Sequence, residues 1–161
     1  MTEPRLDSTD LRMLEVLQRE GRITNAELAE RVNISPSPCL RRLQRLESDG
    51  VVTGYRAELD PRKVGLGLQA WVRVQLEKHG TAVIDRFVER VNACDEVLAC
   101  FALTGDLDYL LQVYVVDLDH FSRFLLDKLL NDAGVADVNS SFVLRTVKQA
   151  HALPLHHLEP R

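Results

Sequence analysis

The chain has 161 residues, of which 45% are hydrophobic and 27% are charged, and its formal net charge is −4. This balance is typical of a globular protein and excludes disorder of the whole chain, while the length allows one medium domain or two small ones. No apolar run approaches the roughly 20 residues that would span a bilayer, so we expect no membrane partner.

The first residues and the cysteines predict a cytoplasmic protein. Residues 1–10 contain three acidic residues, Glu3, Asp7 and Asp10, and no apolar block, so a secretory signal is not expected. The 3 cysteines are scattered, odd in number and without CxxC spacing. That usage is typical of free thiols in a reducing compartment.

Start and stop signals predict two short helices before residue 33. Asp7 can accept a backbone N–H as the N-cap of the first helix, and Gly21 can take the left-handed position that ends it. The second helix begins with a capping box, in which Thr24 bonds to the Glu27 amide while Glu27 reaches back. It continues to Val32.

A third helix follows after a very short connection. Ser35 is its expected cap, and the helix ends near Gly50. Pro36 and Pro38 are tolerated in the first turn because those positions have no helical hydrogen-bond partner. Two helices joined so closely must cross steeply, as in a helix-turn-helix. The β-branched and aromatic residues 51–57 then predict a short strand or wing.

The third helix carries a polar face without acidic residues. At 100° per residue, Leu40, Leu43 and Leu46 cluster beside Cys39, and we expect them to face the first helix. On the opposite face arginine can grip a guanine edge, glutamine an adenine edge, and serine or N-terminal amides a phosphate. The residues expected to contact DNA are Asn25, Ser35, Ser37, Arg41, Arg42, Gln44, Arg45 and Arg56.

A solvated amphipathic helix with three arginines for solubility is the alternative, because a charge run on a helix is usually a hydrated surface. The capping box, the short turn, the arginine face and the following wing together favour double-stranded DNA as the partner. A dimer would place two such helices in successive major grooves and recognise a palindromic operator.

Beyond a linker at residues 60–67, the hydrophobic periodicity changes. The expected elements, in chain order, are a strand at 68–76, a helix around 84–91, a hairpin of strands at 97–104 and 108–116, a helix from Asp117 and a strand at 138–147. The order β-α-β-β-α-β is that of a ferredoxin-like unit.

The helices of such a unit cover one face of its sheet. We expect Trp71, Tyr114 and Phe142 on the other face, where they would form an exposed apolar patch. A second copy of the chain is the simplest cover for that patch, which favours a homodimer.

Motifs in both halves of the chain match those of one known family. In the first half they are Leu6-Asp7-Ser8-Thr9-Asp10, Gly21-Arg22-Ile23-Thr24-Asn25, Leu28-Ala29-Glu30-Arg31-Val32, Ile34-Ser35-Pro36-Ser37-Pro38-Cys39 and Arg41-Arg42-Leu43-Gln44-Arg45-Leu46. In the second half the motif is Gly105-Asp106-Leu107-Asp108-Tyr109. With these motifs the chain resembles, over residues 6–148, the Lrp/AsnC (leucine-responsive regulator/asparagine regulator) family of transcription factors.

The resemblance implies an α+β protein of two domains and a tail. Residues 1–59 would form a winged helix-turn-helix that binds operator DNA, and residues 68–148 a ferredoxin-like domain for effector binding and oligomerisation. Residues 149–161 would be the tail, for which a frayed, solvated terminus is expected. The family further implies homodimers that assemble into tetramers or octamers, a small effector such as an amino acid, and no enzyme activity or cofactor.

The effector site is expected at the Gly-Asp turn of the second domain. Turn amides can hold a carboxylate, an acidic side chain can pair with a ligand ammonium, and a tyrosine can line a side-chain pocket. A plain hairpin turn is the alternative from the residues alone. The resemblance implies effector contacts from Gly105, Asp106, Asp108, Tyr109, Ser140, Ser141 and Phe142, the last three closing the pocket of a neighbouring subunit.

Two other functions compete with an effector-responsive regulator. One is an effector-independent, nucleoid-type protein that organises DNA, which predicts weak sequence preference and a steep salt dependence. The other is an enzyme, but the sequence shows no nucleophile–base pair and no phosphate-binding glycine loop. The tail histidines His151, His156 and His157 lack a partner at metal-ligand spacing, so no metal site is expected.

Overall fold

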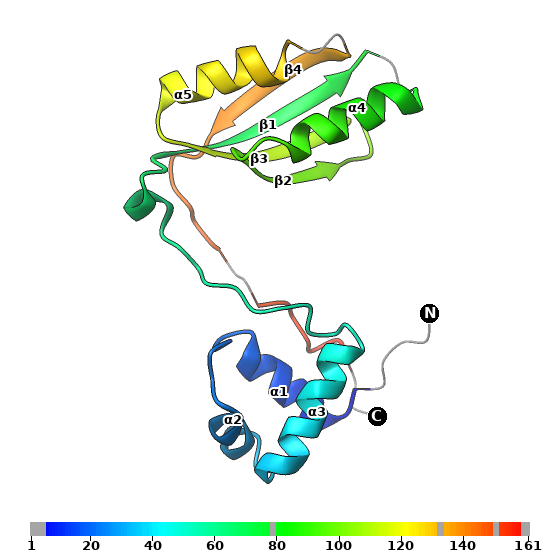
Figure 1. Ribbon diagram of the computed structural model, residues 1–161, viewed down its shortest axis with the longest axis vertical. Coiled ribbons are helices and arrows are strands. Elements are labelled where there is room, and N and C mark those ends of the chain that lie inside the picture. The colour runs from blue at the N-terminus through cyan, green and yellow to red at the C-terminus, as the bar shows by residue number, and fades with distance from the viewer. Residues whose placement is uncertain (1–5, 78–79, 132–133, 150–151, 159–161) are drawn as a thin grey trace. The chain divides into compact units, whose positions relative to one another are not determined.

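The computed structural model describes residues 6–77, 80–131, 134–149 and 152–158. The chain divides into two compact units (Figure 1). We call residues 1–58 together with 147–161 the helical unit, and residues 59–146 the sheet unit. Within the described residues, no helix combines the length and the apolar character needed to cross a membrane.

The helical unit contains α1 (Ser8–Leu17), α2 (Asn25–Arg31) and α3 (Pro36–Ser48). Capping boxes start the first two helices; the box at Thr24 and the N-cap role of Asp7 were predicted, whereas the reciprocal bond from Asp10 was not. Asp7 accepts the Asp10 amide while the Asp10 carboxylate accepts the Asp7 amide, and Thr24 and Glu27 form the same reciprocal pair. These bonds satisfy backbone N–H groups that have no partner within the helix.

The end of α1 differs from the prediction. The helix stops at Leu17, with Gln18 as C-cap in a right-handed conformation. Gly21 lies beyond the cap and has no positive φ, so its expected left-handed role is wrong. Asn33 instead takes the left-handed conformation, with φ 57°, directly after α2. Asparagine tolerates this backbone better than other non-glycine residues, which allows the short turn into α3.

The core of the helical unit confirms most of the predicted apolar face of α3. Cys39 and Leu46 are fully buried, and Leu43 packs against the same cluster. Leu40 is 44% exposed, so its expected inward position is wrong. The buried seam follows positions i, i+4 and i+7 from Cys39, and the next residue lies about 100° away from that seam.

Residues 51–57 do not form the expected strand. The only sheet of the described residues lies in the sheet unit, so this segment has no strand to pair with. Val51 and Val52 pack against the helical core, and the Tyr55 hydroxyl donates to the Glu47 carboxylate at 3.0 Å. Partial burial, together with that hydrogen bond, raises the pKa of Tyr55 to about 12. The segment after α3 is therefore fixed by packing and not by a β-ladder.

The sheet unit has the predicted β-α-β-β-α-β order. Its elements are a 3-10 turn at Pro61–Val64, β1 (Leu68–Leu76), α4 (Thr81–Asn92), β2 (Val97–Ala102), β3 (Tyr109–Val115), α5 (Leu118–Arg123) with a π-helical continuation at Phe124–Leu129, and β4 (Val135–Phe142). The strands are antiparallel in the order β2-β3-β1-β4. The helices α4 and α5 lie on one face of the sheet (Figure 1).

The last strand is displaced from its predicted position at 138–147. β4 begins at Val135 and ends at Phe142, and it pairs with β1 from Leu76 to Ala70. Phe142 lies opposite Ala70, and a final bond from the Val143 amide to the Gln69 carbonyl closes the ladder.

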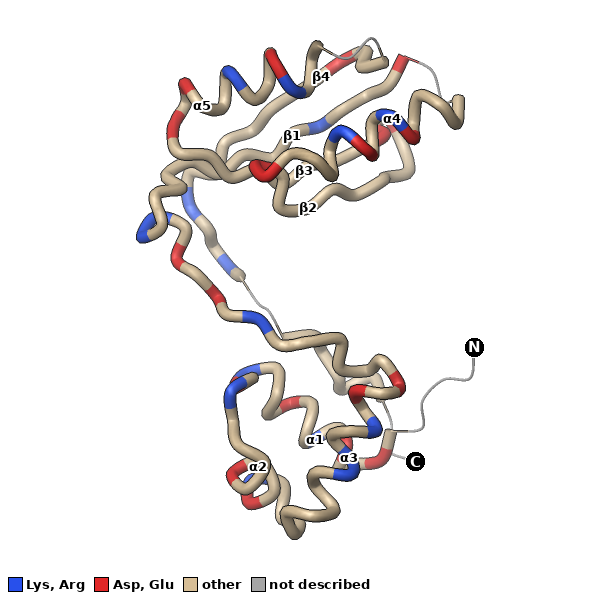
Figure 2. The backbone as a smooth tube through the Cα atoms, viewed as in Figure 1, with Lys and Arg blue, Asp and Glu red and all other residues tan. Residues whose placement is uncertain are grey.

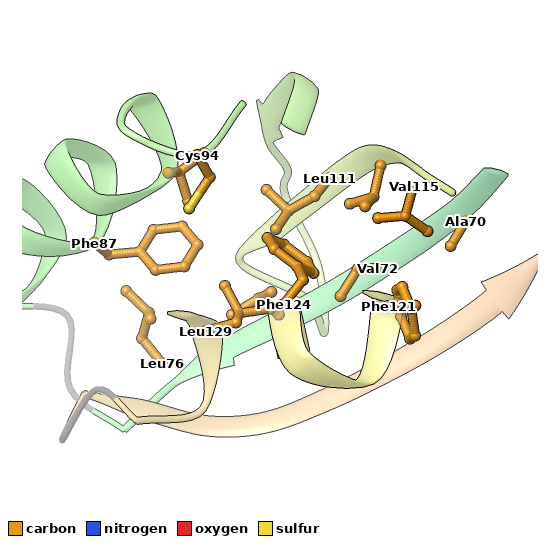
Figure 3. Packing of buried hydrophobic residues seen from close by; sticks show 13 residues of the cluster. Ala70, Val72, Leu76, Phe87, Cys94, Leu111, Val115, Phe121, Phe124 and Leu129 are labelled. Carbon is orange, nitrogen blue, oxygen red and sulfur yellow. The ribbon is translucent and has the colours of Figure 1, made fainter. Parts of the chain in front are cut away.

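The core of the sheet unit lies between the sheet and its helices (Figure 3). Alternate residues of β1 are buried from Ala70 to Leu76, and Phe87, Phe121 and Phe124 pack against them from the helices. This confirms the predicted alternation, which a sheet covered on one face produces.

The open face of the sheet carries two of the three aromatic residues expected there. Trp71 and Tyr114 lie at positions out of phase with the buried residues of their strands, and both are partly exposed. Phe142 is on the other face: it pairs with Ala70, and its ring centroid is 5.0 Å from that of Phe121 in an edge-on contact. Placing Phe142 on the open face was wrong because the register of β4 was not known.

Candidate nucleic-acid interface and ligand site

A buried carboxylate holds two arginines of α3. Asp10 is fully buried, and its Oδ1 accepts from Arg42 Nη1 at 2.9 Å while its Oδ2 accepts from Arg45 Nη2 at 2.5 Å. Charged hydrogen bonds of this kind are short and directional. The start of α1 is therefore fastened to the middle of α3 by one side chain.

Asp7 completes this arginine network. Arg42 Nη1 also donates to Asp7 Oδ2 at 2.6 Å. Burial alone would raise the pKa of Asp7, but the Asp10 amide and the Arg42 guanidinium outweigh it and lower that pKa. The hydrogen bonds to Asp7 and Asp10 raise the pKa of Arg42. The Arg42 side chain is 32% exposed, and its contacts with the two aspartates hold α3 against the start of α1. The Arg45 side chain is 44% exposed and still reaches the surface.

The outward face of α3 contains the polar residues that were predicted for it. Ser37, Arg41 and Gln44 are exposed, and Arg41 has no ion pair with any residue that the structure describes. Figure 2 shows the positive positions along this helix. An open hollow in the surface is lined by Pro38, Arg41, Arg42 and Arg45. The outward face of α3 is therefore basic, and the aspartates of α1 fix the guanidinium groups of Arg42 and Arg45.

The remaining predicted contacts differ in their availability. Ser35 is exposed and its hydroxyl makes no capping hydrogen bond, and Arg56 is exposed in the segment after α3. Asn25 is partly buried, and its Nδ2 donates to the Pro36 carbonyl at 2.9 Å. Its Oδ1 is buried without a hydrogen-bond partner in the described structure. Asn25 therefore braces the turn between α2 and α3.

Sequence reasoning missed the role of the two aspartates. Asp7 was assigned only to the cap of α1, three residues before Asp10, although the carboxylates of both residues also accept hydrogen bonds from the arginines. A signal was present: Asp7 and Asp10 are three apart, as are Arg42 and Arg45, and residues three apart lie on one side of a helix. Matching spacings of opposite charge predict contact only once the two helices are known to cross there.

The predicted ligand turn joins β2 to β3. Gly105 has φ 113°, a conformation that glycine adopts without strain, and Asp106 next to it is exposed. The Asp108 carboxylate accepts the Leu76 amide at 2.7 Å, and the Asp108 amide donates to the Val74 carbonyl at 3.2 Å. Asp108 therefore connects the end of β1 to the start of β3.

Tyr109 faces the helices and not the turn surface. It pairs with Val74 of β1, whose side chain is fully buried, and its ring centroid lies 4.6 Å from that of Phe87 on α4. Burial raises the pKa of the Tyr109 hydroxyl. The ring is partly accessible, so it borders the covered face of the sheet close to the turn.

The three residues of β4 do not share one face. Ser140 pairs with Val72 on the helix-covered face, and Ser141 pairs with Trp71 on the open face. Phe142 pairs with Ala70, near the beginning of β1, whereas the Gly105–Tyr109 turn lies at the end of β1. Within a single chain, the Gly105–Tyr109 turn and residues 140–142 therefore lie apart, at opposite ends of β1.

Comparison with known families matches both units. Residues 6–53 match the family of winged helix-turn-helix DNA-binding domains, and residues 69–153 match the Lrp/AsnC ligand binding domain. The leucine-responsive regulatory protein of Haemophilus influenzae is 38% identical over 150 residues, which span 93% of this chain and 90% of that protein. The DNA-binding transcriptional activator DecR of Escherichia coli strain K12 is 38% identical, with coverages of 93% and 99%.

Solved structures agree with this result. A transcriptional regulator from Neisseria meningitidis, crystallised as a complex with L-Met, is 52% identical, with a TM-score of 0.91 over 94% of this chain and 98% of that chain. An AsnC family transcriptional regulator from Agrobacterium tumefaciens is 33% identical, with a TM-score of 0.89 over 96% and 100%.

A helix-turn-helix with a basic outward face, followed by a ligand-binding sheet domain, defines a DNA-binding transcription regulator and not an enzyme. The chain belongs to the Lrp/AsnC family of transcriptional regulators. Its α+β fold, with a winged helix-turn-helix and a ferredoxin-like domain, is confirmed.

Proposed function

We propose that the regulator places the outward face of α3 in the major groove of double-stranded DNA. The observation that carries this proposal is the exposed Arg41, which has no ion pair among the described residues, beside Arg45, whose partly exposed side chain is fixed by Asp10. A guanidinium can bond a guanine edge bidentately, and the exposed Gln44 can bond an adenine edge in the same way. Ser35, Ser37 and Arg56 are exposed and contact phosphates in this proposal, which fixes the register of the protein on DNA.

The DNA partner is a palindromic operator bound by a homodimer. Two recognition helices related by a two-fold axis contact half-sites about 34–36 Å apart, one turn of the duplex. The partly exposed Trp71 and Tyr114 on the open sheet face support pairing of two sheets, and further assembly gives a tetramer or octamer. Because its target is chromosomal DNA, the protein acts in the cytoplasm.

The effector is an amino acid bound by the sheet unit. Support comes from the relative from Neisseria meningitidis, which was solved as a complex with L-Met. In this chain the amides around Gly105 are suited to a carboxylate, and the exposed Asp106 to an ammonium group. Asp108 acts by holding the turn, since its carboxylate already accepts the Leu76 amide.

A second subunit completes the effector site. Ser140, Ser141 and Phe142 lie at the far end of β1 from the Gly105–Tyr109 turn, so they meet a ligand held by the turn of a neighbouring copy. Ligand binding and assembly are then coupled, because residues from two chains contact one molecule.

Thermal unfolding with each of the twenty amino acids tests the effector proposal. A ligand at 100 times its Kd stabilises the native state by about 2.7 kcal/mol. We expect at least one amino acid, with L-methionine as the first probe, to raise the unfolding temperature. Asp106→Ala should weaken that response, while Asp95→Ala, an exposed acid on another loop, should leave it unchanged. No shift with any amino acid would favour an effector-independent DNA-organising protein.

A further inference from the structure

The C-terminal tail is part of the helical unit, which contradicts the expectation of a frayed, solvated terminus. In the described tail, Leu153 lies against Gln18, the C-cap residue of α1. The Leu153 amide donates to Gln18 Oε1 at 2.5 Å, and Gln18 Nε2 donates to the Leu153 carbonyl at 3.3 Å. Leu155 packs against the apolar cluster formed by the three helices.

The Gln18 side chain bonds to the backbone of the tail, at the amide and carbonyl of Leu153. Its carboxamide offers one acceptor and donors in one plane, which is the pattern that a neighbouring strand would present to a peptide group. The Leu153 side chain is 73% exposed, so it contributes little to the contact. Leu155 supplies the apolar part, and its burial fixes which residue of the tail meets Gln18.

We propose that the carboxyl-terminal end of α1 is a docking surface for the tail of the same chain, and that the docked tail is a second attachment of the DNA-binding helical unit. The chain leaves this unit after Glu58 and returns to it at Val147. With the tail released, only the linker segment holds the unit. With the tail docked, two segments hold it, and closing the second loop removes orientational freedom.

Amide exchange of the full-length protein tests the docking directly. Gln18→Met keeps the size of the side chain and removes both hydrogen bonds. We expect the Leu153 amide to exchange about tenfold faster in this variant than in the unsubstituted protein. Leu155→Ala should act in the same direction through lost packing, and Leu153→Ala, which alters an exposed side chain, should leave exchange of that amide unchanged. Equal exchange rates in the unsubstituted protein and Gln18→Met would overturn the docking.

Rotational diffusion tests the second attachment. The double variant Gln18→Met, Leu155→Ala should give the amides of α2 and α3 a shorter apparent correlation time, with the amides of β1 as an internal reference. Unchanged correlation times, despite faster exchange at Leu153, would overturn the tether. Neither measurement requires DNA or an effector, so its outcome is independent of the proposed function.

Discussion

Asp10→Ala is expected to lower the free energy of unfolding of the helical unit by about 2–4 kcal/mol, because it removes a helix cap and two charged hydrogen bonds. Asp10 is fully buried, and it accepts from the Asp7 amide, Arg42 and Arg45. Without it, the start of α1 loses half of its capping box, and α3 loses its charged link to α1. Denaturant unfolding, followed by the helical signal, measures this change.

Two further variants separate charge from shape at this position. Asp10→Asn keeps the size of the side chain but replaces the carboxylate, so an intermediate loss is expected. Glu15→Ala removes an exposed acid from the same helix and should change stability by less than about 0.5 kcal/mol. If Asp10→Ala were no more destabilising than Glu15→Ala, the arginine network would not hold the two helices together.

Arg41→Ala is expected to weaken specific DNA binding by about 5- to 150-fold for each half-site, the effect of losing there one base contact worth about 1–3 kcal/mol. The thermal stability of the Arg41→Ala variant should equal that of the unsubstituted protein, because Arg41 is exposed and makes no ion pair within the described structure. Arg45→Ala should weaken DNA binding and also lower stability, since this side chain bonds to Asp10. Titration of a labelled operator at fixed salt, beside thermal unfolding, measures both quantities.

Arg86→Ala is the matched control for these two variants. It removes the same charge from the exposed surface of α4 in the sheet unit. Operator affinity should fall equally for all three variants only if net charge, and not position on α3, determines binding. That result would contradict the proposed interface.

The helical part of the fold was predictable because its signals are local. The capping boxes at Asp7 and Thr24 act within three residues, and the two prolines of α3 lie in its first turn. Apart from Gly21 and Leu40, the errors arose where a distant partner decides the structure. Residues 51–57 have β-forming composition but no partner strand among the described residues, and the position of β4 follows from its pairing with β1, from Leu76 to Ala70.

In the candidate sites, too, local features were predictable and contacts between distant residues were not. The exposed positions of α3 follow from helical spacing, which placed Arg41 and Gln44 correctly on the outward face. Spacing could not reveal that Arg42 and Arg45 bond to α1, or that Asn25 bonds to the Pro36 carbonyl, since both depend on how the helices cross. A motif likewise places Asp108 in a ligand turn without showing that its carboxylate binds the backbone of β1.

Selection of bound sequences from a random DNA pool tests the central claim, that the outward face of α3 contacts DNA bases, most directly. We expect the unsubstituted protein to enrich a two-fold symmetric motif with half-sites about one helical turn apart. Arg41→Ala should lose the base preference at one symmetric pair of positions and keep the rest. Recovery of no motif, or of an identical motif by Arg41→Ala, would contradict the account.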